Sequence, residues 1–160
     1  MRFAILYSCL FALSATAGCG RNPTAGTTIP DQLTLYSVDP DSAYAREEKD
    51  PEGKELFHGY LVLGKIDVTD ASQRREIMTA LRDGFAQSDG SVYKCFDPRH
   101  AVRAVENGKT VDYLICFHCK QAEVHEGNSH RVVPTTRDPQ AKFNEILTKA
   151  GVPLPPKDGD

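Results

Sequence analysis

The sequence of 160 residues has no tryptophan and no excess of basic charge, and each absence argues against a class of function. The formal net charge is −3 at pH 7, so nothing predicts binding to nucleic acid or to an anionic membrane surface. The lack of tryptophan disfavours a carbohydrate site that relies on aromatic stacking. The glycine-rich nucleotide-binding motifs, the Gly-x-Ser-x-Gly nucleophile motif and the protein-kinase motifs are missing as well.

At the N-terminus a single positive charge, Arg2, precedes an apolar run at residues 3–15. This run is too short to span a bilayer comfortably, and small residues follow it, which is the layout of a secretory signal. Residues 16–19 read Thr-Ala-Gly-Cys and resemble the lipobox of bacterial lipoproteins. The resemblance implies that residues 1–18 are removed and that Cys19 receives the lipid.

The predicted organisation is a tethered single domain. Residues 19–31 are rich in glycine, threonine and proline, lack periodicity and predict a flexible lipidated tether. Residues 32–154 form the domain and residues 155–160 a tail. We expect the lipid to anchor the protein in a membrane of the bacterial cell envelope, facing the periplasm or the exterior. Its expected partners are that membrane and an unidentified envelope protein or ligand, with no nucleic acid.

The hydrophobic pattern of the domain favours the α+β class. Apolar residues recur at helical spacing behind the N-cap candidates Asp70 and Asp138, and Gly151 is placed to end the second helix. Other segments are rich in β-branched and aromatic residues and show no helical spacing. The order of the elements favours an antiparallel sheet of about four strands with two helices packed on it. The predicted elements outside the central hairpin are strands at 33–38 and 57–68 and helices at 70–86 and 138–150.

A hairpin is predicted at Asn107-Gly108, which separates two β-type runs. This dipeptide is the strongest short signal for a two-residue turn between antiparallel strands. The turn fixes the register, so Glu106 faces Lys109 and Arg103 faces Asp112. Both are pairs of opposite charge, which supports the register independently of the turn.

Three cysteines of the domain lie at the far end of this hairpin, in the motifs Cys-Phe-Asp-Pro-Arg-His (95–100) and Ile-Cys-Phe-His-Cys (115–119). Continuing the register places Cys95 beside Cys119, with Cys116 and His100 nearby. The pairing of these two motifs is similar to that of a group of uncharacterised exported bacterial proteins. That resemblance implies no activity, substrate or cofactor.

Three chemistries compete for the cysteines. A structural disulfide between Cys95 and Cys119 would leave Cys116 as a buried thiol, and exported proteins meet an oxidising compartment. A zinc site would use Cys95, His100, Cys116 and Cys119 as a Cys₃His tetrahedron. Thiol redox catalysis would use the Cys-x-x-Cys of 116–119. A Cys116–Cys119 link demands a turn, because residues three apart in an extended strand have Cα atoms about 10 Å apart.

Three further candidates lie outside the cysteine cluster, and the sequence predicts a simple structural role for each of them. Arg99 could bind an anion, although a solvated turn arginine is the simpler interpretation. His58 is predicted to be a strand histidine without a special role. Residues 125–130 resemble the His-Glu-x-x-His metalloprotease motif but are one residue too long and are predicted as a loop. The sequence thus favours a non-enzymatic binding or structural domain without a cofactor, with a zinc-binding or thiol-redox domain as the alternative.

Overall fold

The structure is a computed structural model that describes residues 28–42 and 53–155. Cys19, the predicted signal, most of the predicted tether and most of the predicted tail lie outside the described residues. Within the described ranges, seven strands and two helices follow one another along the chain. They are β1 (Gln32–Val38), β2 (Leu56–Phe57), β3 (Tyr60–Asp67), α1 (Ala71–Ala86), β4 (His100–Glu106), β5 (Lys109–Cys116), β6 (Gln121–Glu126), β7 (Ser129–Pro134) and α2 (Pro139–Lys149).

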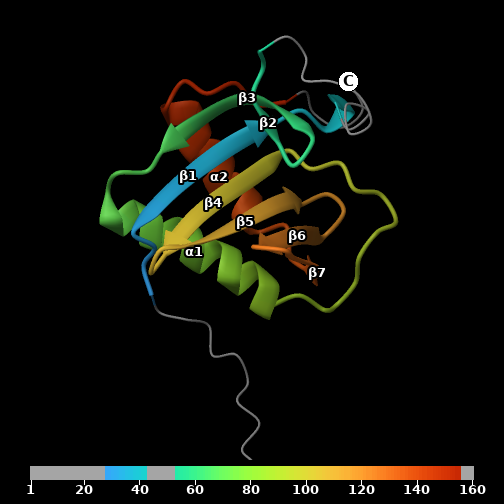
Figure 1. The fold of residues 1–160 in the computed structure, drawn as a ribbon. Helices are drawn as coiled ribbons and strands as arrows, with labels where there is room; N and C mark the ends of the chain where they lie inside the picture. Colours follow the sequence, from blue (N-terminus) through green and yellow to red (C-terminus); the bar gives the residue numbers. More distant parts are fainter. Residues whose placement is uncertain (1–27, 43–52, 156–160) are drawn as a thin grey trace, which may run out of the picture.

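The strands form one sheet in the order β2-β3-β1-β4-β5-β6-β7, and every neighbouring pair is antiparallel (Figure 1). The α+β class, the antiparallel sheet and the two helices are therefore confirmed. The expected number of about four strands is wrong, because the sheet has seven. The segment predicted as one strand at 57–68 is split by a turn at His58-Gly59, where φ is +48° and +87°. Residues 121–134 add a second hairpin that was not predicted.

The central hairpin has the predicted register. Arg103 lies opposite Asp112 and Glu106 opposite Lys109. Asn107 and Gly108 have φ of +52° and +74°, the left-handed conformation that a two-residue turn of this type requires. This register determines which side chains of β4 and β5 share a face of the sheet.

Both helices begin and end within a residue or two of the prediction. The side chain of Asp70 accepts a hydrogen bond from the backbone N–H of Gln73 at 2.7 Å, which caps the start of α1. Asp138 precedes Pro139 at the start of α2, but its side chain makes no capping hydrogen bond. Gly151 follows α2 with φ of +71°, as expected for a residue that ends a helix.

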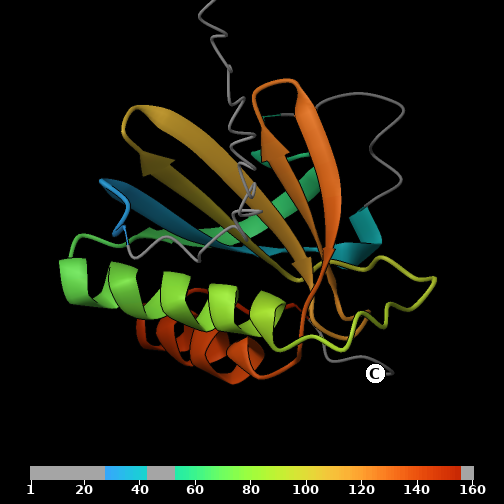
Figure 2. The ribbon, with the colours of Figure 1, turned by 90° about the horizontal axis from the view of Figure 1, so that it is seen from below.

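The two helices lie side by side on one face of the sheet, which we call the helix face (Figure 2). Alternation along each strand points Leu35, Val102 and Ile115 towards the helices, where Leu81 and Phe143 pack on them. All five side chains are fully buried. This face holds the larger of the two hydrophobic clusters and supplies most of the apolar burial that stabilises the domain.

The opposite face, which we call the open face, carries a smaller hydrophobic cluster. Phe57 and Tyr60, at the two sides of the β2–β3 turn, pack with Tyr36 and Leu114 there. Phe96, from the segment between α1 and β4, packs against the same cluster. The β2–β3 hairpin therefore covers part of the open face and brings His58 over the centre of the sheet.

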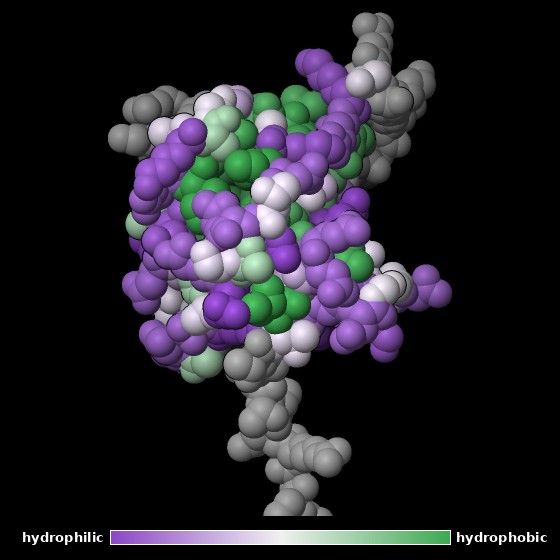
Figure 3. Space-filling view, turned by 90° about the vertical axis from the view of Figure 1, so that its left-hand side faces the viewer, coloured by the Kyte–Doolittle hydropathy of each residue, from purple (hydrophilic) through white to green (hydrophobic). Residues whose placement is uncertain are grey.

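The surface mixes polar and hydrophobic side chains. On the side shown in Figure 3, hydrophobic side chains gather in a patch in the upper half, with polar side chains around it. No helix within the described ranges is long and apolar enough to cross a membrane.

Candidate functional site

The first candidate site is the cysteine cluster at the turn between β5 and β6. Residues 117–120 form a turn in which Lys120 adopts φ of +55° and its N–H donates to the carbonyl of Phe117 at 3.2 Å. The turn brings the Cα atoms of Cys116 and Cys119 to 5.1 Å, and the two residues form a disulfide. The predicted Cys95–Cys119 disulfide is therefore wrong, because the chain turns at residues 117–120, where the prediction continues a strand.

Cys95 is a free thiol that lies against this disulfide. Its Sγ is 3.1 Å from Sγ of Cys119, and its side chain is partly accessible. Gln121 holds the segment in place by donating its Nε2 hydrogens to the carbonyls of Cys95 at 2.6 Å and Tyr93 at 3.1 Å. The predicted closeness of Cys95 and Cys119 is therefore right, although the bond between them is absent.

Backbone donors surround the two bonded sulfurs. The N–H of Cys119 donates to Sγ of Cys116 at 3.1 Å, and the N–H of Asp97 donates to Sγ of Cys119 at 3.5 Å. Such donors stabilise a thiolate when a disulfide is opened. Cys116 and Cys119 are 1% and 0% exposed, whereas Cys95 is partly accessible, so Cys95 is the most accessible residue of the three.

His100 does not join the cysteines. It points to the helix face, where its Nε2 hydrogen-bonds to Oδ1 of Asn144 at 2.7 Å and its ring contacts Phe117 and Phe143. Burial lowers the pKa of His100 to about 4, so the imidazole is neutral at pH 7. The predicted Cys₃His zinc set is not assembled in the described ranges, because alternation along β4 and β5 puts His100 and Cys116 on opposite faces.

Arg99 lies directly before β4. Its backbone N–H donates to Ile115 at 3.2 Å and its carbonyl accepts from Val38 at 3.1 Å, so the backbone of Arg99 is fixed in the sheet. Anion binding by its side chain stays a prediction.

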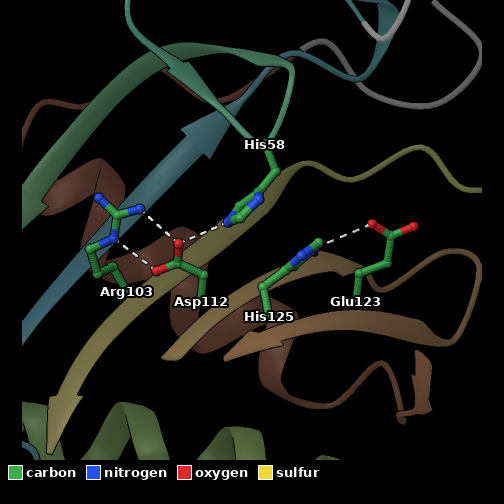
Figure 4. Close-up of polar contacts among 5 residues, drawn as sticks. All are labelled: His58, Arg103, Asp112, Glu123 and His125. Atoms are coloured by element: carbon green, nitrogen blue, oxygen red, sulfur yellow. Dashed lines mark hydrogen bonds and ion pairs between the residues drawn. The ribbon is translucent and has the colours of Figure 1, made fainter. Parts of the chain in front are cut away.

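The second candidate site lies on the open face and begins with an ionic network. Arg103 donates two hydrogen bonds to Asp112, at 2.8 and 2.7 Å (Figure 4). His58 donates from Nε2 to the same carboxylate at 2.8 Å. Burial alone would raise the pKa of Asp112, but the hydrogen bonds from Arg103 and His58 outweigh it and lower the pKa. Asp112 is therefore an ionised carboxylate with a cation on one side and an imidazole on the other.

A histidine and glutamate cluster extends from this network across β6 and β7. The ring of His58 stacks on that of His125, with centroids 3.9 Å apart and an interplanar angle of 17°. His125 and His130 are cross-strand partners, and Nε2 of each lies 3.6 Å from Oε2 of Glu123. Figure 4 shows His125 between His58 and Glu123. Together with Gly59, these residues line a shallow hollow on the surface.

The electrostatics of the cluster keep His125 neutral. Burial lowers the pKa of His125, and the neighbouring His58 and His130 lower it further, while Glu123 acts in the opposite direction. Its Nε2 is buried and lies 3.6 Å from Oε2 of Glu123, which is beyond hydrogen-bond distance. A neutral imidazole with a free lone pair is the form that binds a metal ion.

The sequence alone does not predict this second site. His58 is predicted to lie in a strand but occupies a turn. Residues 125–130 are predicted as a loop but form the tip of a hairpin, with Gly127 at φ of +56°. The alternation of polar Gln121, Glu123 and His125 with apolar Ala122 and Val124 was the signal that could have identified β6.

No family model, curated protein or solved structure matches this chain. The geometry of the two clusters therefore provides the basis for a functional proposal.

Proposed function

We propose that this chain is a lipid-anchored exported domain that exchanges disulfides with other thiols through Cys95, Cys116 and Cys119. The observation that carries the proposal is the 3.1 Å distance between Sγ of Cys95 and Sγ of Cys119, which is itself bonded to Cys116. Thiol–disulfide exchange proceeds by attack of a thiolate on one sulfur of a disulfide. A thiol in contact with a bonded sulfur is placed for that attack.

The first step is an internal exchange. The Cys95 thiol loses its proton to solvent, and the thiolate attacks Sγ of Cys119. A Cys95–Cys119 bond forms while the Cys116–Cys119 bond breaks, and the electron pair leaves on Sγ of Cys116. That sulfur accepts the N–H of Cys119, which stabilises the departing thiolate until it takes up a proton from solvent.

The second step involves a substrate with two thiols, such as a newly exported protein. Its first thiolate attacks the accessible Sγ of Cys95, which forms a mixed disulfide and releases Cys119 as a thiolate. Its second thiol displaces Cys95 and closes the substrate disulfide. The substrate loses two electrons and two protons, and the domain gains one dithiol in place of its disulfide. Partial accessibility of Cys95 supports its role as the point of entry.

Location supports this chemistry. The signal-like residues 1–18 and the lipobox-like Cys19 favour export and anchoring, and exported domains meet an environment in which disulfides persist.

The location itself has a separate test. Cys19→Ala is expected to release the protein from the membrane fraction while its domain stays folded. Cys19→Ala protein that remains in the membrane after a salt wash would contradict the anchor.

A second candidate function is a binding or structural domain in which the disulfide only stabilises the fold. The burial of Cys116 and Cys119, 1% and 0% exposed, favours it. In that case the Cys116–Cys119 bond would be inert in the folded protein, and Cys95 would have no part in its reduction.

Single-turnover reduction of the full oxidised chain by dithiothreitol separates the two functions. The Cys95→Ser variant is expected to slow opening of the Cys116–Cys119 bond by about tenfold or more, because reagent must then reach a buried sulfur. Val92→Ala is a matched control, since Val92 lies in the same segment and is 48% exposed. Equal rates for wild type and Cys95→Ser would leave the binding or structural function. Non-reducing peptide mapping should also find a minor Cys95–Cys119 species in wild type.

A further inference from the structure

The β6–β7 hairpin presents three donor side chains at one point of the open face, apart from the cysteines. We propose that Glu123, His125 and His130 form a binding site for a divalent transition-metal ion such as Zn²⁺. Neither the ionic network of Asp112 nor the thiol chemistry requires these residues. The proposal is therefore independent of disulfide exchange.

The sheet geometry brings the three donors together. Glu123 and His125 are two residues apart on β6, so they point to the same face. His130 lies directly opposite His125 on β7, which puts its side chain on that face too. The short Glu126–Ser129 turn holds this register. The site is thus built on two paired strands, and a rigid framework of this kind keeps ligands in place before an ion binds.

The distances fit a small coordination shell. Oε2 of Glu123 lies 3.6 Å from Nε2 of His125 and 3.6 Å from Nε2 of His130. One ligand atom from each residue lies within 4.8 Å of the others. Around a tetrahedral Zn²⁺ with bonds of 2.0–2.1 Å, ligand atoms are about 3.4 Å apart. Small side-chain rotations would close the difference.

A side-chain nitrogen without a hydrogen bond indicates that a ligand binds at the same place. Nε2 of His125 is buried and makes no hydrogen bond, because Oε2 of Glu123 lies 3.6 Å away, beyond hydrogen-bond distance. A buried polar atom without a hydrogen bond destabilises the fold, so such atoms call for an explanation. Coordination of a metal ion by this nitrogen would satisfy it.

The surroundings of His125 fix its orientation. His58 stacks on its ring at a centroid distance of 3.9 Å, and His58 is held by its hydrogen bond to Asp112. Arg103 holds Asp112 in turn through two hydrogen bonds. This chain of contacts keeps the imidazole of His125 from rotating away from Glu123. Groups that orient a ligand from behind it raise metal affinity.

The donor set selects the class of ion. Two imidazoles and one carboxylate suit zinc and its transition-metal neighbours, whereas calcium and magnesium prefer oxygen ligands alone. Three protein ligands leave one position of a tetrahedron for water or a small ligand. The three donors line one surface hollow together with His58 and Gly59, and the side chain of His130 is 49% exposed.

The test is calorimetric titration of Zn²⁺ into the untagged full chain with the Cys116–Cys119 disulfide intact and Cys95→Ser as background. That background removes the free thiol of the cysteine cluster as a competing ligand. We expect one ion bound at this site, and Glu123→Gln or His130→Ala should weaken it by about 100-fold. Co²⁺ bound in place of Zn²⁺ should give the visible absorption of a four-coordinate ion.

Glu126→Gln is the matched control, because it removes the same charge from the same strand on the opposite face. It should leave the affinity unchanged. Since Glu123→Gln preserves shape and His130 is half exposed, at least one of the two variants should fold, as circular dichroism will show. Zinc affinity that is equal in the Cys95→Ser chain with and without Glu123→Gln or His130→Ala would overturn the proposal, as would the absence of zinc binding to the Cys95→Ser chain.

Discussion

The two faces of the sheet use the same strands for opposite purposes. On the helix face, Leu35, Val102 and Ile115 are fully buried under two helices and belong to a hydrophobic cluster. On the open face, β4 and β5 carry Arg103 and Asp112 in an ionic network. Because side chains alternate along a strand, each face can be changed without changing the other.

This difference separates stability from chemistry. The helix face supplies a core large enough to hold the sheet, so the open face can carry charged and titratable groups. Each polar group on the open face needs a partner, and the ones with the fewest partners mark the candidate sites. The buried Nε2 of His125 is one such group, because it makes no hydrogen bond. Cys95 differs from it, because its thiol contacts Sγ of Cys119 at 3.1 Å.

The largest expected loss of stability comes from a substitution on the helix face. Phe143→Ala should lower the free energy of unfolding by about 3–5 kcal/mol, because it opens a cavity among fully buried side chains. Phe57→Ala, on the open face, should cost about 2 kcal/mol, since the β2–β3 hairpin can move to fill the space. Denaturant titration of the two variants compares the faces directly. A greater loss for Phe57→Ala would show that the open face holds the fold.

The next effect depends on pH. Since burial lowers the pKa of His100 to about 4, the fold favours its neutral form. Protonation in the unfolded chain therefore begins near pH 6.5, and the stability that His100 contributes is present above that pH. It is lost as the pH falls from 6.5 towards 4, by about 3 kcal/mol in all. His100→Gln should remove this part of the slope between pH 7 and 4, and an unchanged slope would show that His100 is protonated inside the fold.

The third effect tests the ionic network. Asp112→Asn should destabilise the domain by about 2 kcal/mol at pH 7, because it leaves Arg103 and His58 without the carboxylate they share. The control is Glu55→Gln, which removes an exposed pair with Lys65 whose side chains are 43% and 46% exposed. That loss should be about 0.5 kcal/mol or less. If thermal melting shows equal shifts for both variants, the network adds nothing beyond a surface ion pair.

The smallest expected effect concerns the turn that sets the register of both faces. Gly108→Val should cost about 1–2 kcal/mol, because a β-branched residue resists the φ of +74° at this position. No atom lies within 4 Å of the added Cβ, so the cost is conformational and not steric crowding. Asn107→Gly keeps the turn and should be close to neutral. Equal denaturant midpoints for Gly108→Val and wild type would contradict the turn assignment.

The parts of the fold that the sequence predicts are those with local signals. The start of α1 follows from Asp70 and the spacing of apolar residues, and the β4–β5 register follows from Asn107-Gly108. Both depend on residues close together in the chain. The helix pair and the central hairpin could therefore be predicted without knowledge of their packing.

The parts that escaped prediction depend on contacts between distant residues. The residues near Lys120 do not predict its left-handed conformation, since lysine is not a typical turn residue. The Cys116–Cys119 disulfide follows from that turn. His58 reaches Asp112 across 54 residues of sequence, so the second site forms only when the whole sheet assembles.

The strand order also bears on association between copies. A sheet that is not closed has two edges whose free N–H and C=O groups can pair with another chain. Here one edge is β2, which is only two residues long. The other is β7, which carries His130 and Arg131 and ends at Pro134, a residue with no N–H to donate. The two outermost strands, β2 and β7, are therefore both poor templates for pairing with another copy of the sheet.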